Sequence, residues 1–208
     1  MNKTPILVLG CGGHARACID VIEATGQYDI AGLLGQQAEV GTRVLGYEVV
    51  GTDADLSDWR QRVSHALVCV GQIKSPRVRQ QLYLQLAQCG FSLPALVSPL
   101  AHVSRHARLG EGTIVMHGAI VNAGAHIGRN VIVNSRALIE HDVTVADHCH
   151  IATGAILNGD VMVGEGTFVG SGSVVCNGVR IGTGCVVGMG RMVFQHCPDH
   201  TTWPHGGA

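Results

Sequence analysis

The sequence predicts an α/β domain of half-Rossmann type over residues 1–95, a parallel β-helix of hexapeptide repeats over residues 96–195 and a C-terminal tail over residues 196–208. Two observations predict this order. In the first part, short apolar runs alternate with helical periodicity, which is typical of a parallel sheet with helices on its faces. From Val97 to Val193 every sixth residue is aliphatic, a period that neither an α-helix nor an ordinary strand produces.

The first elements of the N-terminal domain lie on either side of a glycine-rich turn. The apolar run Ile6–Leu9 predicts a strand, and the spacing of apolar residues after the turn predicts a helix that ends at Gly26. Ile30–Leu34 predicts the second strand. This β-α-β order indicates a small, doubly wound parallel sheet.

A further strand and helix complete the expected domain. Ala66–Val70 predicts the strand. Ser75 and Pro76 are typical of a helix start, because serine caps the first turn and proline fits the first helical position. Gly90 marks the end of this helix, and its expected buried face consists of Val78, Leu82, Leu86 and Cys89.

The glycine-rich turn is a candidate phosphate site. The run Gly10–Ala15 satisfies the pattern G-x-G-x-x-G/A, in which backbone N–H groups and a helix N-terminus approach a phosphate. The domain is too short for an NAD site, and Gly35 and Gln36 stand where an acidic residue for the ribose is expected. The turn therefore predicts either phosphate contact or a purely structural tight turn. His14 either donates to a ligand phosphate or only solvates the surface.

The repeat predicts short strands joined by tight corners. Four positions after each aliphatic residue, from Ala101 to Cys185, the chain carries only Ala, Thr, Val, Cys or Ser, and glycine is common directly after the aliphatic residue. Inward side chains of one coil then stack on those of the next coil. A β-sandwich would instead need alternating patterns and irregular turns. The aliphatic positions are Val97, Val103, Leu109, Val115, Val121, Ile127, Val133, Ile139, Val145, Ile151, Leu157, Val163, Val169, Val175, Ile181, Val187 and Val193.

Charge and composition exclude several classes of partner. The 208 residues carry a formal net charge of −1 and 14% charged side chains, so no electrostatic footprint for nucleic acid or an anionic membrane is present. The run Pro5–Leu9 is too short to span a membrane and no secretory signal follows it, so we expect no membrane insertion and a cytoplasmic location. The eight cysteines contain no C-x-x-C pair and are expected to be reduced, with Cys149 and Cys185 in the small inward column.

His141 is the candidate catalytic residue of the repeat. Three hexads make one coil, so Ala123 and Gly159 are expected above and below His141, where their small size leaves room for a ligand. Glu140 and Asp142 flank it. A carboxylate that accepts from one ring nitrogen fixes the tautomer and raises the basicity of the other nitrogen. A histidine in this setting is either a general base or an ordinary surface side chain.

Several of these segments together resemble one family. The runs Ile139–Asp142 and His148–Ala155, the turn Gly10–Ala15, Gly71, and the segment Val97–Pro99 with the hexads after it resemble the sugar acyltransferases of the NeuD/PglD type. This family belongs to the left-handed β-helix superfamily. The resemblance spans most of the chain, and few other families join a half-Rossmann domain carrying G-x-G-G-H to a β-helix with an E-H-D hexad.

The resemblance implies a homotrimer that uses acetyl-CoA and no metal, with active sites between neighbouring left-handed β-helices. It implies N-acetylation of the 4-amino group of a nucleotide-activated amino sugar in surface-glycan biosynthesis. His141 would be the general base, and Asp142 would orient it. The ligand-binding residues would be His150 and Gly159 by the thioester, Ser171 and Gly188 along the pantetheine, and Gly12, Gly13, His14 and Gly71 around the nucleotide-sugar acceptor.

The chain departs from the family pattern at two places, and two other functions are kept as alternatives. Gly35 and Gln36 replace the acidic pair typical of members that bind UDP-sugars, and the tail only loosely matches the family's usual ending, so Trp203 either packs on the last coil or touches the cofactor. O-acetylation of a sialic acid or related sugar is the runner-up activity. A non-catalytic nucleotide-binding scaffold is the second alternative. The twelve histidines lack the spacing of the β-helix zinc enzymes, so no metal is expected.

Overall fold

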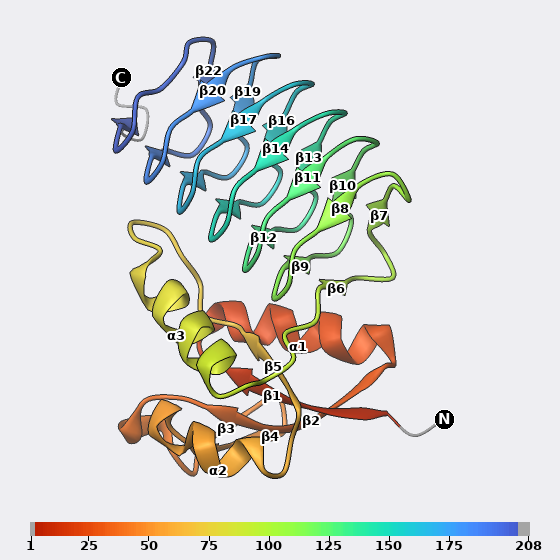
Figure 1. Cartoon of the computed structure of the whole chain (residues 1–208), viewed down its shortest axis with the longest axis vertical. Coiled ribbons are helices and arrows are strands. Elements are labelled where there is room, and N and C mark those ends of the chain that lie inside the picture. The colour runs from red at the N-terminus through yellow and green to blue at the C-terminus, as the bar shows by residue number, and fades with distance from the viewer. Residues whose placement is uncertain (1–2, 204–208) are drawn as a thin grey trace.

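The computed structural model describes residues 3–203 and contains an α/β domain packed against a β-helix (Figure 1). The N-terminal sheet has the order β3-β4-β2-β1-β5, in which only the β3–β4 pair is antiparallel. The β3–β4 hairpin at the edge was not expected from the sequence. The strands span Thr4–Leu9 (β1), Tyr28–Leu34 (β2), Arg43–Val44 (β3), Tyr47–Gly51 (β4) and His65–Val68 (β5).

Helices cover both faces of this sheet. Helix α1 packs on the face that turns toward the β-helix, while α2 and α3 share a core with the other face. Two short 3-10 turns, η1 and η2, follow β2 and β4 at the carboxyl edge of the sheet. The bounds are Gly13–Thr25 (α1), Gln37–Glu39 (η1), Asp53–Asp55 (η2), Leu56–Arg60 (α2) and Arg77–Gln88 (α3).

Helix α1 agrees with the sequence prediction, whereas α3 agrees with it only in part. Helix α1 ends as expected at Gly26, whose φ of 65° lies in the left-handed region that glycine adopts without a Cβ penalty. Helix α3 begins and ends close to the expected positions, but its buried residues are Arg79, Tyr83 and Leu86. The expected buried face was therefore partly wrong, because Val78 is 59% exposed. The face turned inward carries an arginine, which a search for apolar periodicity excludes.

The hexapeptide repeats form a parallel β-helix with three sheets, as the period of six predicted, and the β-helix is left-handed, as the resemblance implied. Strands in successive coils pair in parallel register, for example Ile127 with Val145, three hexads further on. We name the sheets after one strand each. The β9 sheet holds β6 (Leu96–Val97), β9 (Ile114–Val115), β12 (Ile132–Val133), β15 (His150–Ile151), β18 (Phe168–Val169), β21 (Val186–Val187) and β23 (Thr202–Trp203).

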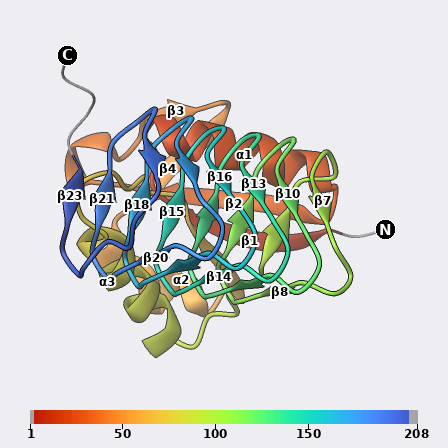
Figure 2. The ribbon, with the colours of Figure 1, turned by 90° about the horizontal axis from the view of Figure 1, so that it is seen from above.

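The other two sheets complete the three-sided prism (Figure 2). The β10 sheet holds β7 (His102–Val103), β10 (Ile120–Val121), β13 (Leu138–Ile139), β16 (Ile156–Leu157), β19 (Val174–Val175) and β22 (Met192–Val193). The β11 sheet holds β8 (Arg108–Leu109), β11 (His126–Ile127), β14 (Thr144–Val145), β17 (Met162–Val163) and β20 (Arg180–Ile181).

The core of the β-helix consists of the two predicted inward columns. Residues such as Val121, Ala125 and Val133 are fully buried, and Cys149 and Cys185 are buried in the small column as expected. All eight cysteines are unpaired. Each additional coil buries a further set of aliphatic side chains against the coil before it, which stabilises the stack through the hydrophobic effect.

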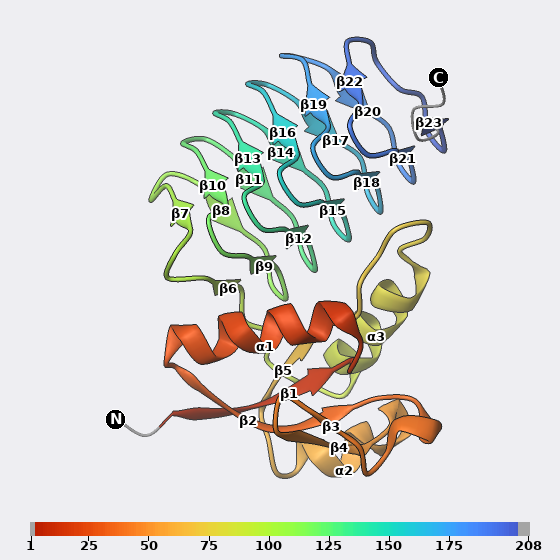
Figure 3. The same cartoon turned by 180° about the vertical axis from the view of Figure 1, so that it is seen from behind.

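The β9 sheet is the side of the prism that contacts the N-terminal domain. Ile114, Met116 and Ile132 of this side are buried together with residues of α1 in one apolar cluster. Figures 1 and 3 agree that β9, β12 and β15 face α1 and α3. The corner between the β10 and β11 sheets is consequently the edge farthest from the N-terminal domain.

The chain closes on a last partial coil. Strand β23 pairs with β21, and Trp203 packs against the core of the β-helix, which is one of the two roles expected for it. Residues 204–208 of the expected tail lie outside the described residues. Across residues 3–203, no helix combines the length and the apolar character needed to cross a membrane.

Candidate active site

His141 and Asp142 form a hydrogen-bonded pair in the turn between β13 and β14. The Nδ1–H group of His141 donates to Oδ2 of Asp142 over 2.9 Å, because a carboxylate oxygen can only accept. The Nε2 atom is then the acceptor, and the side chain of His141 is 57% exposed. The bond to Asp142, with smaller contributions from the charges of Asp142, Asp160 and Glu140, raises the pKa of His141 above its ordinary value. This pair can accept a proton at Nε2.

The small residues around His141 make room for this arrangement. A Cβ atom on Gly159, one coil further along, would lie 2.6 Å from both Nε2 and Cε1 of the His141 ring. On the other side, a Cβ atom on Gly124 would collide with the Asp142 carboxylate. The neighbouring Glu140 instead accepts from Nδ2 of Asn122 over 2.9 Å, so only Asp142 orients the imidazole.

The backbone of Gly159 offers a hydrogen-bond donor beside the imidazole. Within residues 3–203, no acceptor pairs with its N–H group, whereas the N–H groups of Asn158 and Asp160 on either side donate to Val175 and His141. An unpaired donor next to a base is the arrangement that stabilises an oxyanion in acyl transfer.

A cavity of about 510 Å³ lies at the carboxyl edge of the N-terminal sheet. The glycine-rich turn, the ends of β2 and β5, and one side of α3 form its walls. It brings together the four residues expected to bind the acceptor, Gly12, Gly13, His14 and Gly71. Its size is in the ordinary range for a small-molecule site.

His14 is held in this cavity by a cysteine one helical turn further along α1. The Sγ atom of Cys18 lies 3.3 Å from Nε2 of His14. Hydrogen bonding from Cys69, followed by the interaction with His14, lowers the pKa of the buried Cys18 thiol. Gly71 is close beside the imidazole, since a Cβ atom there would be 3.4 Å from Cβ of His14.

His150 is buried between the two domains. Its Nδ1–H donates to the carbonyl oxygen of Gln72 over 2.6 Å, and Nε2 accepts from Nδ2 of Asn134 over 3.0 Å. Its ring lies 6.2 Å from the ring of His14, measured between centroids. Burial lowers the pKa of His150 to about 4, so this imidazole is neutral. Within one chain, His150 therefore lies by the cavity and not by His141.

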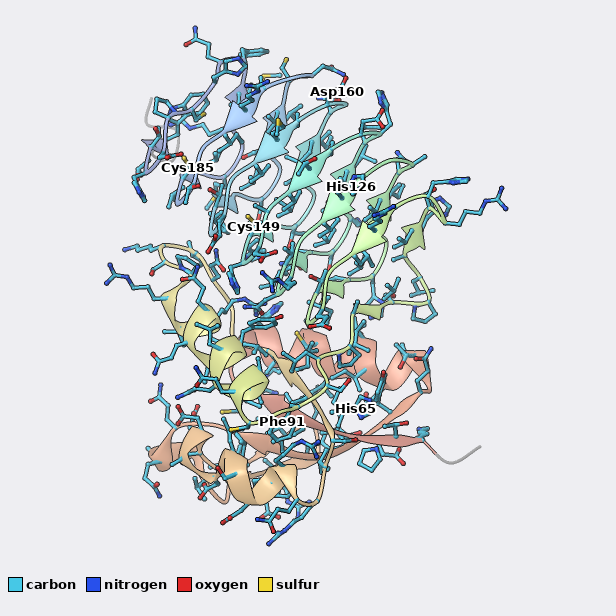
Figure 4. The ribbon with its side chains drawn as sticks, in the orientation of Figure 1. His65, Phe91, His126, Cys149, Asp160 and Cys185 are labelled. Atoms are coloured by element: carbon cyan, nitrogen blue, oxygen red, sulfur yellow. The ribbon has the colours of Figure 1, made fainter. Side chains whose placement is uncertain are left out.

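The two remaining site candidates, Ser171 and Gly188, lie away from both the cavity and His141. Ser171 is exposed in the turn between β18 and β19, and Gly188 follows β21 at the same corner, one coil further on. This corner joins the β9 and β10 sheets, whereas His141 occupies the corner between the β10 and β11 sheets. Figure 4 shows Asp160, one coil after Asp142, at the edge away from the N-terminal domain.

Sequence reasoning missed several residues of the cavity. Glu39, Asp53, Val78 and Leu82 line it, although none was a candidate. The apolar pair belongs to the helix face expected to be buried. Glu39 lies on the short turn after β2, and an acidic residue a few positions beyond the strand end was the available signal. In the described part of the chain, no group of three or more His, Cys, Asp or Glu side chains could hold a metal ion.

Comparison with known proteins shows what this architecture resembles. Residues 5–86 match the model of the PglD N-terminal domain, and residues 160–195 match the hexapeptide repeat of succinyl-transferase. No curated protein sequence matches the chain. WeeI from Acinetobacter baumannii AYE has the same fold, with a TM-score of 0.76 at 19% identity over 96% of each chain.

Two solved structures match nearly the whole chain at higher identity. The acetyltransferase domain of PglB from Neisseria gonorrhoeae FA1090, in complex with acetyl coenzyme A, is 31% identical, with a TM-score of 0.90 over 97% of this chain and 96% of that one. PerB from Caulobacter crescentus, in complex with CoA and GDP-perosamine, is 35% identical, with a TM-score of 0.90 over 97% and 94%. The chain therefore belongs to the PglD/NeuD family of hexapeptide-repeat sugar acyltransferases, and it is an acetyl-CoA-dependent acyltransferase.

Proposed function

We propose that the enzyme transfers the acetyl group of acetyl-CoA to the 4-amino group of a nucleotide-activated amino sugar, in surface-glycan biosynthesis. One observation carries the proposal. His141 has its Nδ1–H bonded to Asp142, which leaves Nε2 free to accept a proton directly beside the unpaired N–H of Gly159. A base and an oxyanion donor that lie side by side can act on one tetrahedral centre.

Each step of the proposed reaction can be given to a group in the site. The lone pair of the sugar amine attacks the acetyl carbonyl carbon, and Nε2 of His141 takes the amine proton. The negative charge that develops on the carbonyl oxygen is stabilised by the N–H of Gly159. The C–S bond then breaks, and the imidazolium returns the proton to the CoA thiolate. Asp142 stabilises the transient imidazolium through the bond at Nδ1.

The cavity in the N-terminal domain supports a nucleotide-linked acceptor. The space beside Gly12 and Gly13 is open. Neither residue has a side chain, and a Cβ atom on either would meet no other atom within 4 Å. The N-terminus of α1 begins at Gly13, so its partial positive charge and free N–H groups face a bound phosphate. The similarity to PerB, which was solved with GDP-perosamine, is consistent with this role.

The separation of His141, the cavity, and the corner with Ser171 and Gly188 supports a homotrimer. His141 lies on the corner away from the N-terminal domain, and Ser171 and Gly188 lie on another corner. One chain cannot unite these groups with its own cavity, whereas neighbouring β-helices packed around a threefold axis can. We assign Ser171 and Gly188 to the pantetheine and His150 to the cofactor side of the acceptor pocket. A neighbouring subunit also covers the exposed His141 and excludes water.

The proposal places the reaction in the cytoplasm, where acetyl-CoA and nucleotide sugars are available. Light scattering on the purified protein should give the mass of three chains of 21.8 kDa each. A monomer would contradict the shared site.

A thiol-release assay with acetyl-CoA tests the activity. The acceptors are UDP-, GDP- and dTDP-linked 4-amino sugars, with free and CMP-linked sialic acid, and the proteins are wild type and His141→Ala. We expect turnover of an amino sugar that falls about 10²-fold to 10⁴-fold in the variant. Activity on a sialic acid alone would instead indicate O-acetylation. No turnover across the panel would point to a non-catalytic scaffold.

A further inference from the structure

The carboxylate of Glu39 lies where a side chain on residue 35 would point. A Cβ atom on Gly35 would be 3.0 Å from Oε2 of Glu39 and would collide with the Cys11 thiol. Gly35 directly follows β2, the strand whose carboxyl end faces the glycine-rich turn. The chain therefore lacks an acidic residue immediately after β2 in sequence but has one at that place in space.

Glu39 is fixed in this position through one of its two oxygens. The backbone N–H of Gln36 donates to Oε2 over 2.8 Å, as part of a capping box on η1. The Cys11 thiol shares the same environment, and burial followed by its hydrogen bond to Glu39 raises the pKa of Cys11 to about 11. Beyond Gln36 and the Cys11 thiol, Glu39 has no hydrogen-bond partner within residues 3–203, and it lines the cavity.

The carboxylate is ionised and has no counter-ion. The hydrogen bond from Gln36 lowers the pKa of Glu39 below its ordinary value. No lysine or arginine lines the cavity, and no ion pair involves Glu39 among the described residues. A partly exposed carboxylate that lines the cavity and has no counter-ion can accept from a further neutral donor, and a hydroxyl group supplies one without adding charge.

The position in the fold identifies the kind of hydroxyl. In α/β sheets that bind nucleotides, phosphate lies on the glycine-rich turn, and an acidic residue at the end of the second strand accepts from the ribose. Glu39 stands at this point beside Cys11 of the turn. The aliphatic side chains of Val78 and Leu82 line the same cavity and offer an apolar surface to a base.

We propose that Glu39 accepts hydrogen bonds from the ribose hydroxyls of the acceptor nucleotide, and that the substrate is consequently a ribonucleoside diphosphate sugar and not a deoxythymidine-linked one. This inference rests on the proposed function only in placing the nucleotide in this cavity. Deoxyribose lacks the 2′-hydroxyl, so it would leave part of the charged acceptor without a donor.

Calorimetric titration of the full-length protein with GDP, UDP and their 2′-deoxy counterparts tests the proposal. The variant Glu39→Gln keeps a carbonyl oxygen that can accept from Gln36, so η1 is retained while the charge is lost. Asp53→Asn makes the same chemical change on the other carboxylate of the cavity. We expect wild type and Asp53→Asn to prefer the ribose form by about 10-fold to 100-fold, and Glu39→Gln by less than about 3-fold.

The outcomes separate this inference from the proposed function. An unchanged ribose preference in Glu39→Gln, a loss of preference in Asp53→Asn, or no preference in wild type would each overturn the role of Glu39 while leaving nucleotide binding intact. No binding of any nucleotide would overturn both. Equal turnover of dTDP- and GDP- or UDP-linked amino sugars would likewise refute the substrate class, although the acetyltransferase itself would stand.

Discussion

The imidazole of His141 lies against the backbone of Gly159 in the following coil, so closely that a Cβ atom on Gly159 would be 2.6 Å from Nε2. We predict that Gly159→Ala lowers kcat by about 10²-fold, because the methyl group displaces the base and blocks the N–H donor. Gly159 does not have a left-handed φ, so alanine fits the backbone. Steady-state kinetics with acetyl-CoA measures the effect.

The double variant Gly159→Ala/His141→Ala is the control for this prediction. Because the methyl group acts partly by displacing the base, adding Gly159→Ala to His141→Ala should slow the enzyme further by less than the loss that Gly159→Ala causes alone. Independent, additive losses would contradict the shared role.

Asp142 should set the pH at which the enzyme becomes active. His141 acts as a base only when neutral, and its pKa is raised by Asp142, so activity is lost as the pH falls through this raised pKa. In Asp142→Asn the pKa of His141 should fall, and the acidic limb of kcat/KM should move to lower pH. The maximal rate should also fall about 10-fold or more, because asparagine does not fix the tautomer. An unshifted limb in the pH profile would show that another group titrates.

The surroundings of His141 could be predicted from sequence because the register of a β-helix is set by its own repeat. Once each coil holds three hexads, the neighbours Ala123 and Gly159 follow by counting, and the structure places both there. The position of Trp203 on the last coil depended on long-range packing, so sequence left two alternatives.

The N-terminal domain was less predictable because its decisive contacts depend on packing between domains or on a short turn that the apolar pattern does not show. Arg79 is buried and donates to carbonyl groups of β5 and of the β-helix. Glu39 reaches the space beside Gly35 only once η1 has formed. A search for apolar periodicity finds neither of these polar contacts. The assumption that buried helical faces are apolar therefore failed at Arg79.

We expect the side chain of Arg79 to make the main polar contact between the two domains. Its guanidinium is buried and donates to the carbonyls of Val68 and Val70 and to both oxygens of Asn130. Burial lowers the pKa of Arg79 to about 10, which still leaves it charged at neutral pH. We predict that Arg79→Met lowers the free energy of unfolding by about 3 kcal/mol or more, because it leaves several buried acceptors unpaired. Urea denaturation measures this loss.

Arg77→Met is the matched control for this variant. Arg77 lies on the same helix but is exposed, so its loss should change the free energy of unfolding by less than about 0.5 kcal/mol. Equal effects of the two substitutions would show that helix propensity, and not the buried hydrogen bonds, accounts for the result.

His150 should make the fold sensitive to acid. Burial lowers its folded-state pKa to about 4, whereas an unfolded chain has a histidine pKa of about 6.5. Between these values only the unfolded state binds the proton, so the stability present above pH 6.5 is lost as the pH falls toward about 4. The difference corresponds to about 3 kcal/mol. In His150→Gln this part of the pH dependence should disappear, whereas His126→Gln, on the exposed side of the β-helix, should leave it unchanged. Urea midpoints measured between pH 7 and about pH 4.5 decide the question: a variant whose stability falls as steeply as that of wild type would show that another buried group takes up the proton.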